Sequence, residues 1–381
     1  MKSFGLWYLK SQVENIKQEI TENNTQENTS ENTNDSNETS LTELEHSEFD
    51  LHVNFWSLED YKHTNNSIVP CLDIGIKIYK YKLIDRLTFF CPFQVEREDI
   101  FDLADKMSIK NNANIIFNTD CEIHTKDNYT IIELEQNEHL LVFPLNQVIK
   151  GVYSIKNGGY GTKLEFDFQN FGNYVKSNHG LNKLNTLYIR FRIKGKALRH
   201  HIYFDSEPLN KSFESAFSGT RMIDFKVNEK RNINEKVRAE IIVNHEELAK
   251  LKTVHFLLME PSAYEVMSFD NYVMNCRELE KDLWDDYLGM SIDFSKGHIL
   301  AYHWRTQAEK ECFNCLVKVN YSKTKPLTIV VYAIVVVALG IISSAGVTAV
   351  SIWLPNNLGA MLATSLFGIF LIIFGILIGR R

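Results

Sequence analysis

The sequence lacks a dense cysteine framework and an N-terminal apolar run. Six cysteines occur in 381 residues, at Cys71, Cys91, Cys121, Cys276, Cys312 and Cys315. Disulfide-dense scaffolds are short secreted chains with closely spaced cysteines, which this is not. The first twenty residues, MKSFGLWYLKSQVENIKQEI, have no uninterrupted apolar core of the length that a secretory signal needs. We therefore expect reduced thiols in a cytosolic domain.

Basic residues are missing from residues 21–48, which hold eight acids and no Lys or Arg. Without these eight acids the formal net charge changes from −7 to +1. The body of the chain is therefore close to neutral, and it is not a generally basic nucleic-acid binder. Because the tract is rich in Asn, Thr, Glu and Ser and poor in apolar residues, it predicts a disordered, flexible linker. Before it, residues 1–20 are interpreted as a short amphipathic segment, either a dangling terminus or a motif that docks a partner protein or touches the membrane.

Two short motifs resemble known functional motifs, but neither supports a chemical reaction. The stretch NGGYGTK at Asn157–Lys163 lacks the Walker spacing and lies between two strand-like runs, so it predicts a hairpin turn. Cys312 and Cys315 form a single C-x-x-C, which supplies two of the four ligands that zinc normally needs. Unpaired thiols are the favoured interpretation there, and palmitoylation is the alternative.

The stretch DCEIH is the one candidate for metal ligation. Alternation in a strand would place Asp120, Glu122 and His124 on one side and Cys121 on the other. No second cluster at a zinc-like spacing supports a site, so we expect no metal. No nucleophile–base pattern is visible either, and we expect no cofactor and no catalytic residues.

From about residue 50 the chain shows short β-branched and aromatic runs separated by Asn, Gly and Asp, such as LDIGIKIYKY and TKLEFDF. This spacing predicts a mainly β region over residues 50–320, an antiparallel sandwich or barrel, with a few helices and a weak boundary near 170–185. Helices are expected over Val95–Met107 and from the capping pattern SAYE at Ser262–Glu265. A further apolar stripe runs from Leu279 to Leu288, and Gly289 would end that helix.

The segment Asn185–Phe204, NTLYIRFRIKGKALRHHIYF, carries the candidate binding residues. In a strand its apolar residues face one way and its basic and tyrosine residues face the other. Guanidinium groups at this spacing suit phosphate or carboxylate, so we expect a nucleotide or oligonucleotide ligand. The alternative is a solvated face paired with acids of a neighbouring strand, such as Glu165 and Asp167. The candidate residues are Tyr188, Arg190, Arg192, Lys194, Lys196, Arg199, His200 and His201.

The C-terminal end has two long apolar runs that contain no Asp, Glu, Lys, Arg or His. Residues 327–354 and 358–379 each exceed the roughly 20 residues that span a bilayer, which predicts a transmembrane helical hairpin over 327–379. Flanking Lys and Arg place both ends in the cytosol, and the expected location is the inner membrane, multi-pass. Missing ionisable groups argue against proton relays and voltage sensors. Small residues predict close helix packing or a pore, at Gly340, Ser344, Thr348, Ala360, Thr364, Gly368, Gly375 and Gly379.

A β-rich cytosolic part followed by two bare membrane helices resembles, in layout, the membrane effectors of bacterial anti-phage defence systems. The resemblance implies a sensor domain that detects a nucleotide, an oligonucleotide or a partner and controls the oligomeric packing of the helices, which then permeabilise the membrane. The implied partners are the lipid bilayer and further copies of the chain. The alternative is a membrane-anchored β-sandwich scaffold without pore activity, and an anchored enzyme ranks third.

Overall fold

The protein is seen here as a computed structural model of the whole chain. The described residues are 2–11, 47–58, 62–63, 66–67, 70–126, 128–155, 161–169, 171, 175, 181–195, 198–206, 218–269, 272–280, 283–289, 297–322 and scattered positions between 330 and 366. The chain divides into two compact units. The first comprises Met1–Phe204, Ile223–Ala263 and Ser268–Val317, and the second comprises Asp205–Met222, Tyr264–Met267 and Lys318–Arg381.

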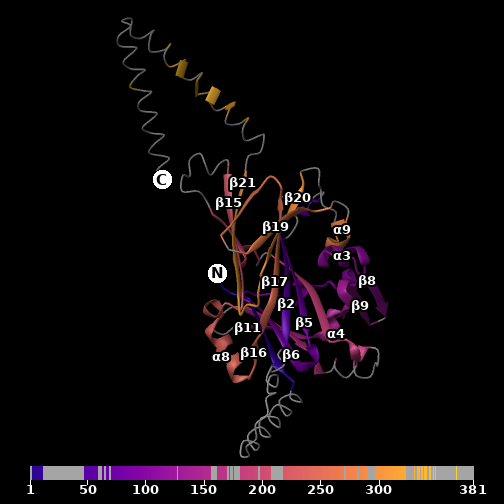
Figure 1. Cartoon of the computed structure of the whole chain (residues 1–381). Helices are drawn as coiled ribbons and strands as arrows, with labels where there is room; N and C mark the ends of the chain where they lie inside the picture. The colour runs from indigo at the N-terminus through magenta and orange to yellow at the C-terminus, as the bar shows by residue number, and fades with distance from the viewer. Residues whose placement is uncertain are drawn as a thin grey trace, which may run out of the picture. The chain divides into compact units, whose positions relative to one another are not determined.

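The first unit is built on a ten-stranded mixed sheet (Figure 1). Its order is β19 (Val273–Glu278), β20 (Ile299–Arg305), β17 (Lys250–Pro261), β2 (Glu48–Trp56), β5 (Cys71–Tyr79), β13 (Thr186–Lys194), β10 (Glu138–Val142), β9 (Tyr129–Leu134) and β8 (Glu122–Lys126), with β7 (Ile100–Asp102) also pairing with β13. The β17–β2 and β10–β13 pairs are parallel and the other neighbours are antiparallel.

A second sheet covers one face of the first. Its five strands follow the order β11 (Ile149–Ile155), β12 (Gly161–Asp167), β6 (Ile84–Cys91), β1 (Gly5–Lys10) and β16 (Glu247–Leu248). Alternating apolar residues such as Phe49 and Phe191 turn toward it, because successive side chains in a strand point to opposite faces. The Phe89 and Phe191 rings lie 5.6 Å apart and the Tyr8 and Phe49 rings lie 5.3 Å apart, measured between centroids. The apolar core of the first unit therefore lies between two sheets, as in a β-sandwich.

Short helices pack against the outer faces. Helices α3 (Lys110–Phe117) and α9 (Leu283–Leu288) lie side by side on the ten-stranded sheet (Figure 1), where the Asn112 amide donates to the Asp286 carboxylate at 2.8 Å. Helix α8 (Glu235–Val243) packs Val237 and Ile241 against Trp7. Other helical elements of the described residues up to 322 are α2 (Ala104–Met107), α4 (Leu145–Val148), α6 (Leu198–His201) and the 3-10 turns Tyr81–Leu83, Arg97–Asp99, Glu135–Asn137, Leu181–Lys183 and Lys230–Asn232.

The remaining strands form a four-stranded sheet in the order β14 (Tyr203–Ser206), β15 (Ser218–Val227), β21 (Phe313–Ser322) and β18 (Glu265–Ser268), and a small ribbon of β3 (Lys62–His63) and β4 (Asn66–Ser67). Within the second unit, Arg221 Nε lies 3.1 Å from Asp205 Oδ1, and the Asn320 amide donates to Glu265 at 3.1 Å. The second unit is thus held partly by polar contacts among its strand ends.

The described residues are mainly β with few helices, as the regular strand spacing indicated. Three local predictions were wrong. Residues 5–10 do not belong to a separate amphipathic terminal segment, because they form β1 inside the five-stranded sheet. Val95–Met107 holds a 3-10 turn, β7 and the single turn α2 in place of one helix, and the SAYE pattern lies at a turn before β18. The apolar stripe before Gly289 does form α9, which ends where Gly289 takes a φ of +68°.

The predicted transmembrane hairpin, and with it the multi-pass location, is corrected by the structure. Across the described part of the chain, no helix combines the length and the apolar character that a bilayer crossing requires. Hydropathy reports that a run is apolar, whereas a span also requires one continuous helix that satisfies its own backbone. Most of residues 327–379 lie outside the described residues. So do residues 21–46 of the predicted linker and five predicted packing positions, Ala360, Thr364, Gly368, Gly375 and Gly379. Glu48, at the end of the predicted linker, is the first residue of β2.

Three of the predicted packing residues are described, namely Gly340, Ser344 and Thr348, and each is helical. The Thr348 hydroxyl donates to the Ser344 carbonyl at 3.0 Å. This is the local contact that a threonine in a helix makes with the residue four positions earlier. It assigns a local role to this pair and leaves the predicted packing of one helix against another without support.

Candidate functional site

Polar side chains line the face of the ten-stranded sheet that turns away from the five-stranded sheet. One row across the strands consists of Arg190 on β13, Gly75 on β5, His52 on β2, His255 on β17 and Arg305 on β20, each directly opposite the next. These positions alternate along each strand with the apolar residues of the core. The same alternation that builds the sandwich therefore also gathers polar groups on its outer face.

A cavity of about 630 Å³ lies over this face. Its floor is formed by residues of β2, β5, β13, β17, β19 and β20, and the C-terminal end of α3 forms a wall from Ile115 to Thr119. Among the described lining residues, five are Lys or Arg and only Asp50 carries a carboxylate. A cavity of this size falls within the range of small-molecule sites.

Arg190 is the most deeply buried cation of the described pocket lining, with 1% of its surface exposed against 7% for Lys77. Its Nε donates to the Tyr287 hydroxyl at 2.9 Å, and its Nη1 donates to the Tyr188 hydroxyl at 2.8 Å. With the Asn54 amide turned so that its oxygen faces the guanidinium, Nη2 donates to that oxygen at 3.0 Å. Within the described ranges no carboxylate contacts Arg190 directly, so its hydrogen bonds go to neutral groups, and it is linked to the charge of Asp73 through the Tyr287 hydroxyl.

Gly75 makes room for this arrangement. A Cβ atom at this position would lie 2.2 Å from the Tyr188 hydroxyl and 2.8 Å from Arg190 Nη1. Both side chains therefore cross over the β5 backbone at the one residue that has no side chain. Burial works against the charge of Arg190, but Tyr188, Tyr287 and Asp73 outweigh it and raise its pKa, so the guanidinium is charged.

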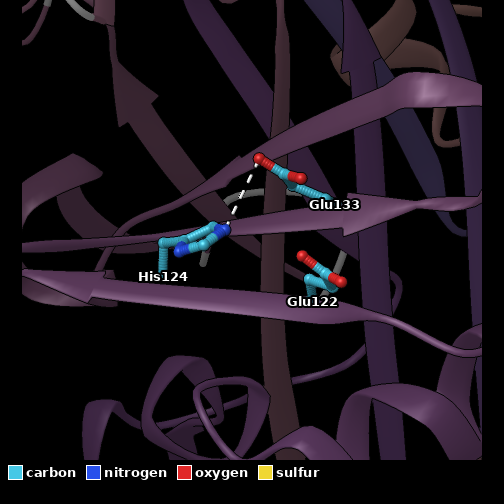
Figure 2. Close-up of side chains that lie close together, drawn as sticks. All are labelled: Glu122, His124 and Glu133. Carbon is cyan, nitrogen blue, oxygen red and sulfur yellow. Dashed lines mark ion pairs between the residues drawn. The ribbon is translucent and has the colours of Figure 1, made fainter.

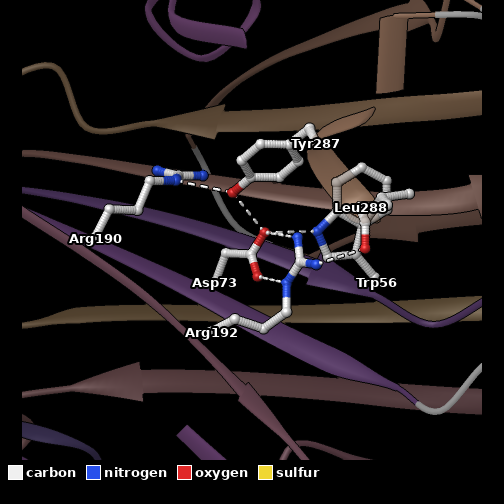
Figure 3. A network of polar contacts seen from close by, with 6 residues as sticks. All are labelled: Trp56, Asp73, Arg190, Arg192, Tyr287 and Leu288. Atoms are coloured by element: carbon white, nitrogen blue, oxygen red, sulfur yellow. Dashed lines mark hydrogen bonds and ion pairs between the residues drawn. The ribbon is translucent and has the colours of Figure 1, made fainter. Parts of the chain in front are cut away.

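Arg192, two residues further along β13, belongs to a buried network around Asp73, which the Tyr287 hydroxyl links to Arg190 (Figure 3). Asp73 accepts from Arg192 Nε at 2.5 Å and from Nη2 at 2.9 Å, and it also accepts from Trp56 at 3.1 Å and from the Tyr287 hydroxyl at 2.7 Å. Arg192 Nη1 reaches the Leu288 carbonyl at 3.2 Å. This network fastens α9 to the sheet, and Arg192 is committed to it.

Burial of Asp73 would raise the pKa of its carboxyl group. The charge of Arg192 and its hydrogen bonds, helped by Arg190 and the Tyr287 hydroxyl, outweigh that effect and lower the pKa. Asp73 is therefore ionised at neutral pH. Its charge is balanced by the bidentate contact with Arg192, which is the strong geometry for a carboxylate and a guanidinium.

Three histidines meet on the pocket floor. His52 Nδ1 lies 3.3 Å from the Tyr188 hydroxyl, and its ring is 4.9 Å from that of His255 between centroids. His255 Nδ1 lies 2.9 Å from His303 Nε2, and these two rings stack at 5.1 Å. Burial, aided by neighbouring positive groups, lowers the pKa of His255 to about 3 and that of His303 to about 4, and it holds the pKa of His52 well below its usual value. All three are neutral hydrogen-bonding groups at neutral pH.

Two further arginines stand at the pocket. Arg277 on β19 donates to the Asn118 side chain at 3.0 Å and to the Ile115 carbonyl at 3.3 Å, which ties it to the end of α3. Arg305 on β20 is exposed. In the part of the chain that the structure describes, neither forms an ion pair with a carboxylate. The two lysines differ, because Lys77 contacts Glu138 at 2.6 Å and Lys252 contacts Glu48 at 2.7 Å.

The structure places the candidate binding residues of the Asn185–Phe204 segment in several different environments. Arg190 lines the pocket, Tyr188 is buried beside it in contact with Arg190 and His52, and Arg192 contacts Asp73 and the end of α9. Elsewhere, Lys194 lies over the Phe101 ring at 4.5 Å, Arg199 contacts Tyr203, His201 stacks on Phe93, His200 is exposed and Lys196 lies outside the described residues. The predicted alternation along this strand is correct, but its polar face is buried and not solvated. The acid opposite Arg192 is Asp73, whereas Glu165 and Asp167 belong to β12 in the other sheet.

Most of the pocket residues were missed at the sequence level. His52, His255, His303, Arg277 and Arg305 come from four strands that are far apart in the chain. The signal available was the alternation of polar and apolar residues in DLHVNF, which places Asp50, His52 and Asn54 on one face. Comparison with known proteins adds no homologue, because no protein-family model and no curated protein matches this chain.

Proposed function

We propose that this protein is a binding protein whose ten-stranded sheet takes a small phosphate-bearing ligand, of the nucleotide class, in the pocket over His52 and His255. The observation that carries the proposal is that Arg190, Arg277 and Arg305 converge on one cavity, and none of them has a carboxylate partner among the described residues. A guanidinium group that lacks a counter-charge in a partly closed site is well matched to phosphate oxygens, which accept two parallel hydrogen bonds.

The rest of the pocket suits the uncharged part of a nucleotide. Phe117 on α3 packs near the Tyr188 ring at 5.2 Å and the His52 ring at 6.0 Å, which gives an aromatic wall. The neutral histidines and the Asn275 amide supply donors and acceptors on the floor. Because the cavity volume of about 630 Å³ matches one nucleotide, we propose a mononucleotide. An oligonucleotide would instead require a groove with successive stacking platforms.

The chemistry favours binding over catalysis. The histidines are turned toward one another and toward Tyr188. Among the described residues the Tyr188 phenol is the hydroxyl hydrogen-bonded to them, and burial raises its pKa, which makes it a weak nucleophile at neutral pH. Cys276 lines the pocket, but desolvation raises the pKa of its thiol, which makes it a weaker nucleophile at neutral pH.

The test is calorimetric titration of the full chain with ATP, ADP and pyrophosphate, with adenosine as the uncharged probe. We expect the phosphate-bearing probes to bind and the double variant Arg277→Gln/Arg305→Gln to lose at least about tenfold in affinity, since a charge-assisted hydrogen bond contributes about 1.5–3 kcal/mol. Arg238→Gln is the matched control, because Arg238 is an exposed arginine on α8, away from the pocket. Its affinity should equal that of the wild type.

Two results would contradict the proposal. One is failure of the wild-type chain to bind any of the three phosphate-bearing probes. The other is unchanged affinity in the double variant, which would show that these arginines do not contact the ligand. Both arginines are partly or fully exposed, so their replacement should leave the circular-dichroism spectrum unchanged and the comparison remains interpretable.

A further inference from the structure

Four side chains capable of metal ligation meet on the outermost strands of the ten-stranded sheet, away from the pocket arginines. Glu122 and His124 alternate on one face of the edge strand β8 (Figure 2). Glu133 on β9 lies directly opposite Glu122, and His139 on β10 lies directly opposite Glu133. Asp120, which the sequence grouped with Glu122 and His124, contacts Lys110 and Asn114 instead.

The distances in this cluster are those of a metal site. One ligand atom each from Glu122, His124 and Glu133 can be chosen so that all three lie within 4.8 Å of one another. His124 Nε2 is 3.5 Å from Glu133 Oε1, and His139 Nε2 is 3.2 Å from the same oxygen. Ligands about 2.1 Å from a tetrahedral zinc ion are separated by roughly 3.4 Å, so these nitrogen–oxygen distances already match.

The charge pattern of the cluster calls for a cation. Glu122 and Glu133 are direct cross-strand neighbours, and like charges in this position destabilise a sheet. Within the described ranges neither glutamate forms an ion pair with Lys or Arg, and the groups next to Glu133 are two imidazoles. A divalent ion between the carboxylates would turn this repulsion into attraction.

The orientation of His139 is a second, independent observation. Its Nδ1 lies 2.9 Å from the Asn137 carbonyl oxygen, which can only accept a hydrogen bond, so Nδ1 carries the hydrogen. With Nδ1 occupied in this way, the remaining ring nitrogen, Nε2, points at the carboxylate oxygen of Glu133, 3.2 Å away. Metal-binding histidines are commonly held in this way, with the distal ring nitrogen donating to a backbone carbonyl.

We propose that Glu122, His124 and Glu133 bind a divalent transition-metal ion of the zinc type, with His139 as the fourth ligand. Imidazole nitrogen and carboxylate oxygen are ligands that zinc and cobalt accept in tetrahedral sites. Glu122 and His124 are exposed on the edge strand β8, and Glu133 and His139 on the next two strands are partly exposed, so the ion can enter from solvent. The site joins β8, β9 and β10 through their side chains.

The experiment is titration of the chelator-treated full chain with Co²⁺, whose visible absorption reports tetrahedral coordination, followed by displacement with Zn²⁺. The wild type is expected to take up Co²⁺ with this absorption, and Glu133→Gln and His124→Asn should each lower the affinity at least tenfold. His298→Asn is the matched control, because His298 also lies beside a glutamate, Glu278, on an exposed surface, where no third ligand is near in the described chain. Its titration should match that of the wild type.

The proposal is overturned if the wild type shows no tetrahedral Co²⁺ absorption, or if Glu133→Gln and His124→Asn bind as tightly as the wild type. Both residues are at least about one-third exposed in side-chain surface (37% and 54%), so neither change removes core packing. Far-ultraviolet circular dichroism of each variant checks that the fold is kept, and a third variant, Glu122→Gln, repeats the test at a fully exposed ligand.

Discussion

Replacing Arg192 with methionine should be among the most damaging single changes in the first unit. Methionine keeps much of the side-chain volume but removes the charge opposite Asp73. Asp73 is 0% exposed, and of its four hydrogen bonds it would keep only those from Trp56 and Tyr287. Breaking one side of a buried ion pair costs about 3–5 kcal/mol, because the remaining charge stays buried without compensation.

The assay is urea unfolding at pH 7, followed by tryptophan fluorescence. The network contains its own reporter, since Trp56 donates to Asp73 and its ring lies 5.3 Å from that of Trp284. Lys194→Met is the control on the same face of the same strand. Lys194 is half-buried and lies over the Phe101 ring, a contact that contributes about 0.5–1 kcal/mol.

The refuting result is a loss of free energy of unfolding in Arg192→Met no larger than that in Lys194→Met. Acidification gives a second check. Because the folded-state pKa of Asp73 is lowered, its contribution is complete above the unfolded value of about 3.9 and is lost as the pH falls through the folded value. The stability difference between wild type and Arg192→Met should therefore shrink below about pH 4.

Two further predictions concern the pocket floor. Gly75→Ala should lower the free energy of unfolding by about 1–3 kcal/mol, because the new Cβ atom would overlap the buried Tyr188 hydroxyl and Arg190. An unchanged melting temperature in thermal unfolding would contradict this prediction. Burial lowers the pKa of His255 to about 3 and of His303 to about 4, so between pH 6.5 and pH 4 the unfolded chain binds more protons and stability falls as the pH falls. His255→Asn should flatten this dependence in melting curves recorded over that range, and an equally steep curve would show that His255 does not titrate as described.

Local patterns in the sequence predicted the structure correctly where the feature depends on a single strand or helix. The alternation in TLYIRFRIK separates Ile189 and Phe191 from Arg190 and Arg192, and the structure keeps that separation. The apolar stripe ending at Gly289 gives α9, because a glycine readily takes the left-handed conformation that ends a helix. In both cases the governing interactions lie within one strand or one turn.

Local patterns failed where burial came from distant residues. The segment GLWYLK was interpreted as part of a short amphipathic terminal segment, yet it is β1, because β6 and β16 pair with its two edges. Hydropathy over residues 327–379 predicted a membrane hairpin that the described residues do not contain. Composition measures how apolar a segment is, and it does not determine which surface or which neighbouring strand receives that segment.

The sequence by itself determined a mainly β protein and one strand whose basic face was a candidate binding surface. Only the tertiary structure decided which of those basic residues are available. It paired Arg192 with Asp73 and left Arg190 without a carboxylate, in a row with His52 and His255. The physical reason is that a strand's alternation fixes which side chains share a face, whereas sheet order and register fix the charges they meet, and those depend on residues more than a hundred positions away.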